Sequence, residues 1–255
     1  SELGIKQRAE NLIKANPERK DAITADLERL IAPDQMGELF KVMTISGIPE
    51  QAPFETGNSL SGIKEITHGF FGRRGGCSNA AFFSLNVSFA TKDDRDNITR
   101  NRAIAMASLG LNPKNLVTMS QVHSSKIVEI GPGHDPDQRP EADGMVTREA
   151  GIALGVLAAD CTPVLFADPK ARIIAVCHAG WRGALGGIVG NTVQAMVQLG
   201  AVRENIIAAI GPTIWPENYQ VGAEFARQFL RMHPGGERYI VFPQNTDGEH
   251  FDLPG

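Results

Sequence analysis

The pattern of apolar and polar positions changes character after about residue 50. Residues 4–45 are rich in charge and carry apolar residues at helical spacing, with a break at Pro17. Short apolar stripes of this kind predict amphipathic helices, which another surface must cover. We therefore predict a helical N-terminal extension over residues 1–55, which docks on the main domain or on a partner protein. A loosely held terminal segment is the alternative.

Residues 56–255 have the pattern of a main domain that mixes strands and helices. The continuous apolar run 151–159 predicts a strand that is buried on both faces. Glycine and proline exclude a helix over 131–140. The predicted strands are 68–71, 84–87, 116–119, 151–159, 164–166, 173–176 and 206–210, and the predicted helices are 93–109, one that follows residue 183, and 223–232.

Composition narrows the classes of protein to which the chain can belong. Its 255 residues are 42% hydrophobic and 21% charged, which is enough for a globular core. The net charge of -4 and the pI near 5.9 argue against a nucleic-acid partner, which requires a basic surface. No apolar run approaches the roughly 20 residues of a membrane span, so we expect no membrane partner. Three scattered cysteines and the lack of a signal-peptide pattern lead us to expect a cytoplasmic protein.

Three residues whose side chains could bind a metal or act in catalysis lie where a predicted strand gives way to a turn. They are His123, Cys161 and His178. Two imidazoles and one thiolate leave a fourth position open on tetrahedral zinc, the arrangement in which zinc lowers the pKa of a bound water toward about 7. Spacing alone favours ordinary core residues, because no close-spaced pair fixes a metal. The same trio would also suit a cysteine nucleophile with a histidine base or, with an axial methionine, copper.

Residues near the trio have possible supporting roles. After His178 the chain passes through a glycine-rich turn into a helix, where free backbone N–H groups and Arg182 could hold an anion such as phosphate. Asp143 and Asp160 could orient a ligand histidine or cap a turn, and composition favours the cap. Cys177 precedes His178 in one strand, so its side chain should point to the opposite face, into the core.

Seven short sequence words occur in a fixed order along the main domain. They are HGFFGRRGG at 68–76, SLN at 84–86, QVH at 121–123, EADG at 141–144, ADCTP at 159–163, HAGWRG at 178–183 and GP at 211–212. In this order they resemble the YfiH-type laccase-domain proteins, a family named both for multicopper polyphenol oxidoreductases and for purine nucleoside phosphorylases. The resemblance covers about residues 68–253.

The resemblance implies an α+β fold of layered mixed β-sheets flanked by helices. It also implies that His123, Cys161 and His178 are the catalytic residues and the ligands of a zinc ion, with copper as the alternative. The residues that it places at the substrate or phosphate are Arg73, Arg182, Asp143 and Gln121.

The activities associated with the family are phosphorolysis of adenosine, inosine and methylthioadenosine and hydrolytic deamination of adenosine. The resemblance therefore predicts a zinc-dependent purine nucleoside phosphorylase with adenosine deaminase activity, acting on a small-molecule nucleoside and phosphate. The alternatives are a copper-dependent polyphenol oxidase, a cysteine hydrolase or amidase of cell-wall precursors, and a metal-binding partner protein without turnover. Six scattered histidines are too few for a trinuclear copper cluster, which ranks the oxidase second.

The chain departs from the usual pattern of the family in two places. Ser124 follows His123 where the family usually has glycine. The chain stops at Gly255 where family members continue with another helix and strand, so we expect a truncated C-terminal end and an incomplete pocket.

In residues 1 to about 50, the run PDQMGELFKV at 33–42 resembles the carboxyl tail of a family of S-adenosylmethionine-dependent methyltransferases. No cofactor-binding half accompanies this run, and we infer no methylation.

Overall fold

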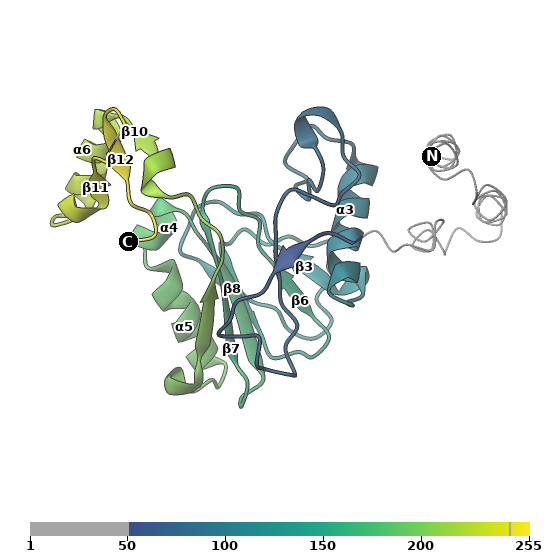
Figure 1. The fold of residues 1–255 in the computed structure, drawn as a ribbon. Coiled ribbons are helices and arrows are strands. Elements are labelled where there is room, and N and C mark those ends of the chain that lie inside the picture. The colour runs from purple at the N-terminus through teal and green to yellow at the C-terminus, as the bar shows by residue number, and fades with distance from the viewer. Residues whose placement is uncertain (1–50, 245) are drawn as a thin grey trace, which may run out of the picture. The chain divides into compact units, whose positions relative to one another are not determined.

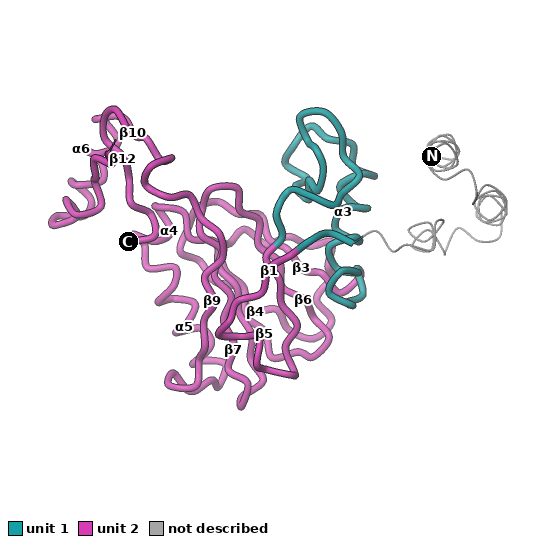
Figure 2. The backbone as a smooth tube through the Cα atoms, in the orientation of Figure 1, with its two compact units in different colours: residues 1–53, 71–113 teal, residues 54–70, 114–255 magenta. Residues whose placement is uncertain are grey.

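The computed structural model describes residues 51–244 and 246–255, which form two compact units (Figures 1 and 2). Within the described chain, one unit comprises residues 51–53 and 71–113, and the other comprises residues 54–70 and 114–255. Helices occur together with several β-sheets, of which the largest is mixed, and this confirms the expected α+β class. The helices predicted before residue 50 lie outside the described residues.

The smaller unit is built on helix α3 (Arg95–Ser108), which confirms the helix predicted over 93–109. Its N-terminus is capped by Asp94, whose side chain accepts a hydrogen bond from the Asp96 N–H at 2.8 Å. Fully buried Ile104 packs with Ala52 and Leu85 in the core of this unit.

A buried side chain of α3 holds the glycine-rich loop of the smaller unit. Asn101 accepts a hydrogen bond from the Cys77 N–H at 2.8 Å and donates to the Ser78 hydroxyl at 2.8 Å and the Asn86 carbonyl at 2.7 Å. Because these polar groups bond to a helix side chain, they form no strand ladder. The predicted strand over 84–87 is therefore wrong.

The larger unit is built on a five-stranded mixed sheet with strand order β4-β5-β8-β7-β9. Strands β4 and β5 are parallel, and the other neighbours are antiparallel. The strands are β4 (Ile127–Glu129), β5 (Gly144–Thr147), β7 (Thr162–Asp168), β8 (Ile173–Ala179) and β9 (Ile207–Ile210).

The central strand β8 separates two core layers. Its side chains alternate between the two faces of the sheet. Ala175 and Cys177 pack with Ile188 of helix α5 (Ile188–Gln198) on one face, which agrees with the core position predicted for Cys177. Val176 packs with Met119 on the other face, where β3 (Leu116–Thr118) pairs in parallel with β6 (Ala153–Gly155). His178 follows the alternation and lies on the Val176 face.

Two predicted elements differ in the structure. The predicted strand 151–159 is only the three-residue β6, because its partner β3 is equally short, and its alternate residues Leu154 and Val156 pack on one core face only. The single helix predicted after residue 183 is two helices, α4 (Trp181–Leu185) and α5, because Gly187 interrupts it at a φ of 80°.

The C-terminal part of the larger unit is a small sheet next to a helix. The predicted helix 223–232 is confirmed as α6 (Ala223–Met232), and Phe225 and Phe229 on it contact the ring of Phe251. The sheet has the order β10 (Gln220–Val221), β12 (Glu249–Phe251), β11 (Ile240–Val241). The remaining short elements are β1 (Phe54–Glu55), β2 (Phe70–Phe71), and the 3-10 turns η3 (Ala80–Phe82), η4 (Pro113–Asn115), η5 (Arg203–Asn205), η6 (Pro216–Asn218) and η7 (Glu237–Tyr239).

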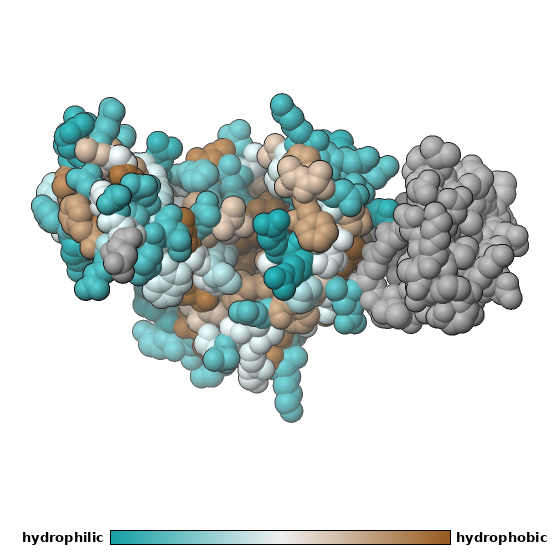
Figure 3. Space-filling model, turned by 45° about the horizontal axis from the view of Figure 1, so that its top comes forward, coloured by the Kyte–Doolittle hydropathy of each residue, from teal (hydrophilic) through white to brown (hydrophobic). Residues whose placement is uncertain are grey.

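On the face shown in Figure 3, apolar residues are interspersed with hydrophilic ones. Some large apolar side chains are exposed, among them Trp215 and Phe242. Within the part of the chain that the structure describes, no helix combines the length and apolar character needed to cross a membrane.

Asp168 holds the turn that connects β7 to β8 in the five-stranded sheet. Its buried carboxylate accepts hydrogen bonds from the N–H groups of Lys170 at 2.9 Å, Ala171 at 3.0 Å and Val202 at 2.9 Å. Burial raises the pKa of this carboxyl, but these backbone hydrogen bonds outweigh it and lower the pKa below the ordinary 3.8.

The change Asp168→Asn is expected to destabilise the fold by about 2 kcal/mol, because the amide NH₂ would face at least one of three N–H donors. A group with a lowered folded pKa contributes stability that is complete above its unfolded pKa and is lost as the pH falls through the folded pKa. The difference from wild type, measured by urea unfolding, should therefore be constant above about pH 5 and shrink below the ordinary pKa of 3.8. The exposed loop variant Asp137→Asn is the control. A difference that persists unchanged at pH 2 would contradict this assignment.

Candidate metal centre

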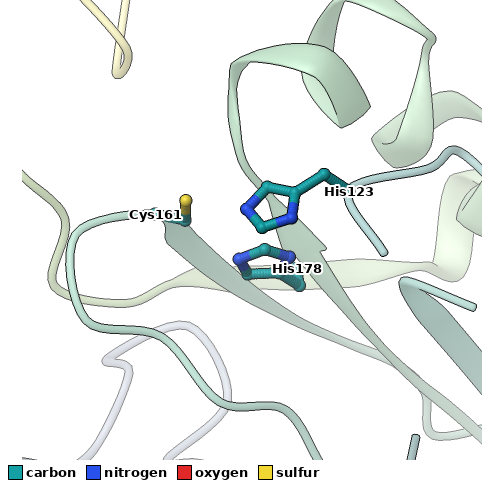
Figure 4. Close-up of side chains that lie close together, drawn as sticks. All are labelled: His123, Cys161 and His178. Carbon is teal, nitrogen blue, oxygen red and sulfur yellow. The ribbon is translucent and has the colours of Figure 1, made fainter. Parts of the chain in front are cut away.

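His123, Cys161 and His178 come together in the larger unit, with their side chains pointing toward one another (Figure 4). One ligand atom from each lies within 4.8 Å of the others. The imidazole rings of His123 and His178 meet edge to face, with centroids 5.0 Å apart. The structure thus places the three predicted residues in one cluster.

The strand register explains why Cys161 and His178 meet. Cys161 directly precedes β7, and His178 is the penultimate residue of β8. The two strands are antiparallel, and Pro163 lies opposite His178. The start of one strand and the end of the other therefore lie at one edge of the sheet, which brings these two strand-end residues together.

His123 reaches the same point from a loop after β3. Its φ of 59° lies in the left-handed region, which is unfavourable for a residue other than glycine and requires support from its surroundings. Gly180 supplies space beside it. A Cβ atom on Gly180 would lie 3.0 Å from the Cys161 sulfur and 3.0 Å from Cδ2 of His123.

One buried carboxylate contacts both histidine-bearing segments. Oδ1 of Asp143 lies 2.9 Å from Nδ1 of His178, so the carboxylate accepts a hydrogen bond from the Nδ1–H group, which leaves Nε2 as the ligand atom. Oδ2 accepts hydrogen bonds from the Val122 N–H at 3.1 Å and the Ser124 N–H at 2.6 Å, on either side of His123. Asp143 is fully buried. The geometry therefore supports the histidine-orienting role.

The local environment sets the protonation of these groups. Burial lowers the pKa of His178 despite the hydrogen bond to Asp143, which favours the neutral imidazole that binds metals. Burial raises the pKa of Asp143, but its hydrogen bonds, that with His178 first, bring the net pKa below the ordinary value. Burial, together with the negative charges of Asp160 and Asp143, raises the pKa of the Cys161 thiol. A cation at the trio would favour the thiolate, since a coordinated thiol is deprotonated.

The three side chains fit a zinc-type metal ion by their chemistry. Two imidazoles and a thiolate are ligands that zinc and copper both accept, and three protein ligands leave a position for a reacting molecule. The fixed Nδ1 tautomer of His178 is typical of metal-bound histidine. Elsewhere in residues 51–244 and 246–255, no other group of three histidine, cysteine or acidic side chains gathers in this way.

Charged and aromatic side chains lie near Cys161. The Arg182 guanidinium lies 4.9 Å from the centroid of the Trp181 ring and, within the described residues, forms no hydrogen bond or ion pair. Burial raises the pKa of the Tyr219 phenol; the charges of Cys161 and Asp160 raise it further, whereas Arg182 lowers it. Tyr219 and Arg182 thus share one electrostatic neighbourhood with Cys161.

The other residues predicted to bind substrate have different surroundings. The Gln121 side-chain amide forms two hydrogen bonds with the backbone of Leu157. It donates to the Leu157 carbonyl at 2.7 Å and accepts from the Leu157 N–H at 2.8 Å. Arg73 belongs to the smaller unit, where its Nε donates to the Phe83 carbonyl at 3.3 Å beside an open cavity of about 370 Å³. Substrate contacts of Arg73, Arg182, Asp143 and Gln121 remain predictions.

Sequence reasoning missed two residues of this neighbourhood. Tyr219 lies just before the predicted helix 223–232 and was given no role, and Ser124 was noted only as a departure from glycine. Nothing in their spacing relates them to Cys161 or to Asp143, which are distant in sequence. The word EADG, however, marked Asp143, and a polar residue next to a ligand histidine is a natural partner for such a carboxylate.

Gly180→Ala is expected to weaken metal binding at the trio by at least about tenfold, because the new Cβ would press on Cys161 and His123. The φ of Gly180, -79°, is open to alanine, so the backbone itself should tolerate the change. The measurement is competition for Zn²⁺ with a chromophoric chelator. The matched control is Gly190→Ala in α5, where a Cβ has no neighbour within 4 Å. Equal affinity of the Gly180 variant and wild type would refute the steric argument.

Curated relatives share most of this chain. A Deinococcus radiodurans protein named purine nucleoside phosphorylase is 40% identical over 191 residues, covering 74% of this chain and 72% of the relative. A Streptomyces coelicolor protein with the same name is 39% identical over 166 residues, covering 65% of this chain and 69% of the relative. Both names agree with the function that the sequence words imply.

Solved structures show the same fold. A Neisseria meningitidis protein matches with a TM-score of 0.66 and 28% identity, over 79% of this chain and 78% of its own. YlmD from Geobacillus stearothermophilus matches with a TM-score of 0.62 and 31% identity, over 72% of each chain. The methyltransferase resemblance before residue 50 lies outside the described residues and stays a prediction. The profile of the multi-copper polyphenol oxidoreductase laccase family matches residues 67–255, and the chain belongs to this family, as its sequence words predicted.

Proposed function

We propose that the chain is a zinc-dependent purine nucleoside phosphorylase whose metal is held by His123, Cys161 and His178. The observation that carries the proposal is the gathering of these three donors within 4.8 Å, with the tautomer of one imidazole fixed by a buried carboxylate. The names of the relatives support the reaction. Zinc is preferred over copper because two imidazoles and one thiolate with an open position are a catalytic zinc set.

The family description also raises copper oxidation of polyphenols. A multicopper oxidase needs a trinuclear cluster in addition to an electron-entry copper, and therefore many more imidazoles than one trio. All six histidines lie within the described residues, and only two of them join a candidate metal group there. The small number of histidine ligands thus favours the phosphorylase over the copper oxidase.

In phosphorolysis, an oxygen of inorganic phosphate forms a bond to C1′ of the ribose while the bond from C1′ to the purine nitrogen breaks. The products are ribose 1-phosphate and the purine, which takes up a proton. We assign Arg182 to binding the phosphate, because its guanidinium is exposed, acts on Tyr219 together with the charge of Cys161, and is not paired within the described residues. Asp160 adds negative charge next to Cys161, where the positive charge that develops on the ribose would be stabilised.

Hydrolytic deamination of adenosine is the second activity that we propose for the same site. It replaces the amino group at C6 with oxygen from water and releases ammonia. A metal of this type, when bound, would lower the pKa of a water molecule. The residues of the chain would hold that metal and orient the base.

A cysteine hydrolase is the second candidate, and one observation favours it. Asp143, His178 and Cys161 have the order of an acid, a base and a nucleophile, with the carboxylate on Nδ1 of the histidine. The raised pKa of the Cys161 thiol argues against it, because reactive cysteines lie where their pKa is lowered. His123 has no role in such a triad, which makes it the residue that separates the two functions.

The test is metal analysis of the purified protein followed by chromatography of adenosine and inosine reactions with and without phosphate. We expect hypoxanthine or adenine only when phosphate is present, and inosine from adenosine in its absence. Formation of no purine base under any condition would overturn the phosphorylase. Turnover that survives a chelator would favour the cysteine hydrolase instead.

A further inference from the structure

Ser124 makes two contacts with the carboxylate that orients His178. Its backbone N–H donates to Oδ2 of Asp143 at 2.6 Å, and its hydroxyl donates to the same oxygen at 2.9 Å. The hydroxyl also accepts a hydrogen bond from the Lys126 N–H at 3.2 Å. A serine hydroxyl has one proton, and the N–H of Lys126 occupies one of its lone pairs. The proton is therefore free to point to Asp143.

This arrangement links the two histidines through one carboxylate. His123 lies between Val122 and Ser124, both of which donate backbone N–H groups to Oδ2 of Asp143. These bonds hold a segment whose central residue has an unfavourable φ of 59°. The other oxygen of the carboxylate holds His178. Movement of Asp143 would thus displace both imidazoles together.

We propose that Ser124 is a positioning residue of the metal centre, acting through Asp143. Its hydroxyl fixes the rotation of the carboxylate, so that Oδ1 meets His178 while Oδ2 meets the backbone beside His123. The consequence is a site whose histidines are arranged before metal arrives, which raises the affinity for metal. This inference rests on the proposed metal-binding role of the trio.

The test is titration of the metal-free full chain with Co²⁺, whose visible spectrum reports ligand geometry and thiolate coordination, with Zn²⁺ affinity measured by chelator competition. Ser124→Ala removes the hydroxyl and keeps the backbone N–H. We expect about tenfold weaker binding of both ions, in the range found when outer partners of metal ligands are removed, and a changed cobalt spectrum. Ser125→Ala, the neighbouring serine that has no contact with Asp143 among the described residues, should bind as wild type does.

A double-mutant cycle shows whether Ser124 acts through the carboxylate. In an Asp143→Asn background, Ser124→Ala should cause no further loss of affinity, because the group that it positions has changed. Wild-type affinity and spectrum in Ser124→Ala, or a loss that simply adds to that of Asp143→Asn, would overturn the inference. Failure of the wild-type chain to bind Co²⁺ at all would instead overturn the proposed metal site.

Discussion

His123→Ala is expected to remove the bound metal and to reduce turnover by at least about a hundredfold, since metal catalysis contributes several kcal/mol and each 1.4 kcal/mol is a factor of ten. One of three protein ligands is lost, while Cys161 and His178 remain. The side chain of His123 is exposed, so the free energy of unfolding without metal should change little. Metal content by elemental analysis and rates of phosphorolysis are measured on the same preparation.

His134→Ala is the matched control for this experiment. His134 is also a loop histidine of the larger unit, although it is half-buried, and its ring nitrogen Nε2 lies 3.2 Å from the Gln138 carbonyl. Its variant should keep both metal and turnover. Turnover that remains in His123→Ala after the metal is lost would eliminate the metal mechanism and leave the Cys161 nucleophile with His178 as its base.

The sequence singled out the three residues that gather in space because they stand in specific motifs and next to predicted strands, whereas their role as metal ligands stays a prediction. Antiparallel pairing of β7 and β8 then brought two of them to one edge of the sheet. The missed partner, Ser124, acts through a hydrogen bond across 19 residues of sequence, and such contacts leave no periodicity to detect. The competing interpretation of Asp143 as a turn cap failed for the same reason.

The errors in secondary structure have a common cause. The apolar run 151–159 predicted a strand buried on both faces, but its residues are only partly buried or exposed, and β3 offers only three residues for pairing. Likewise, the apolar spacing after residue 183 continues across Gly187, although its positive φ ends one helix before the next begins. Tertiary pairing and backbone conformation, rather than burial, decided these boundaries.

Asp143→Ala is expected to cause the largest loss of stability, about 3 kcal/mol in the metal-free protein. The change would leave four donors without their acceptor: Nδ1 of His178, the Val122 N–H, and the N–H and hydroxyl of Ser124. Each buried donor that loses its acceptor costs about 1–3 kcal/mol, and water entering the space left by the carboxylate would recover part of the total. Urea unfolding in the presence of a chelator measures the effect without a contribution from bound metal.

Metal affinity should fall with stability in Asp143→Ala, by about a hundredfold, because both histidine segments lose their common anchor. The control is Glu141→Ala, an exposed acidic residue two positions earlier, which should change neither quantity. Comparison with His123→Ala then separates two causes of metal loss. The histidine variant loses a ligand and keeps its fold, whereas the aspartate variant keeps all three ligands and loses the arrangement that brings them together. Wild-type stability in Asp143→Ala would show that the buried carboxylate does not hold this edge of the sheet.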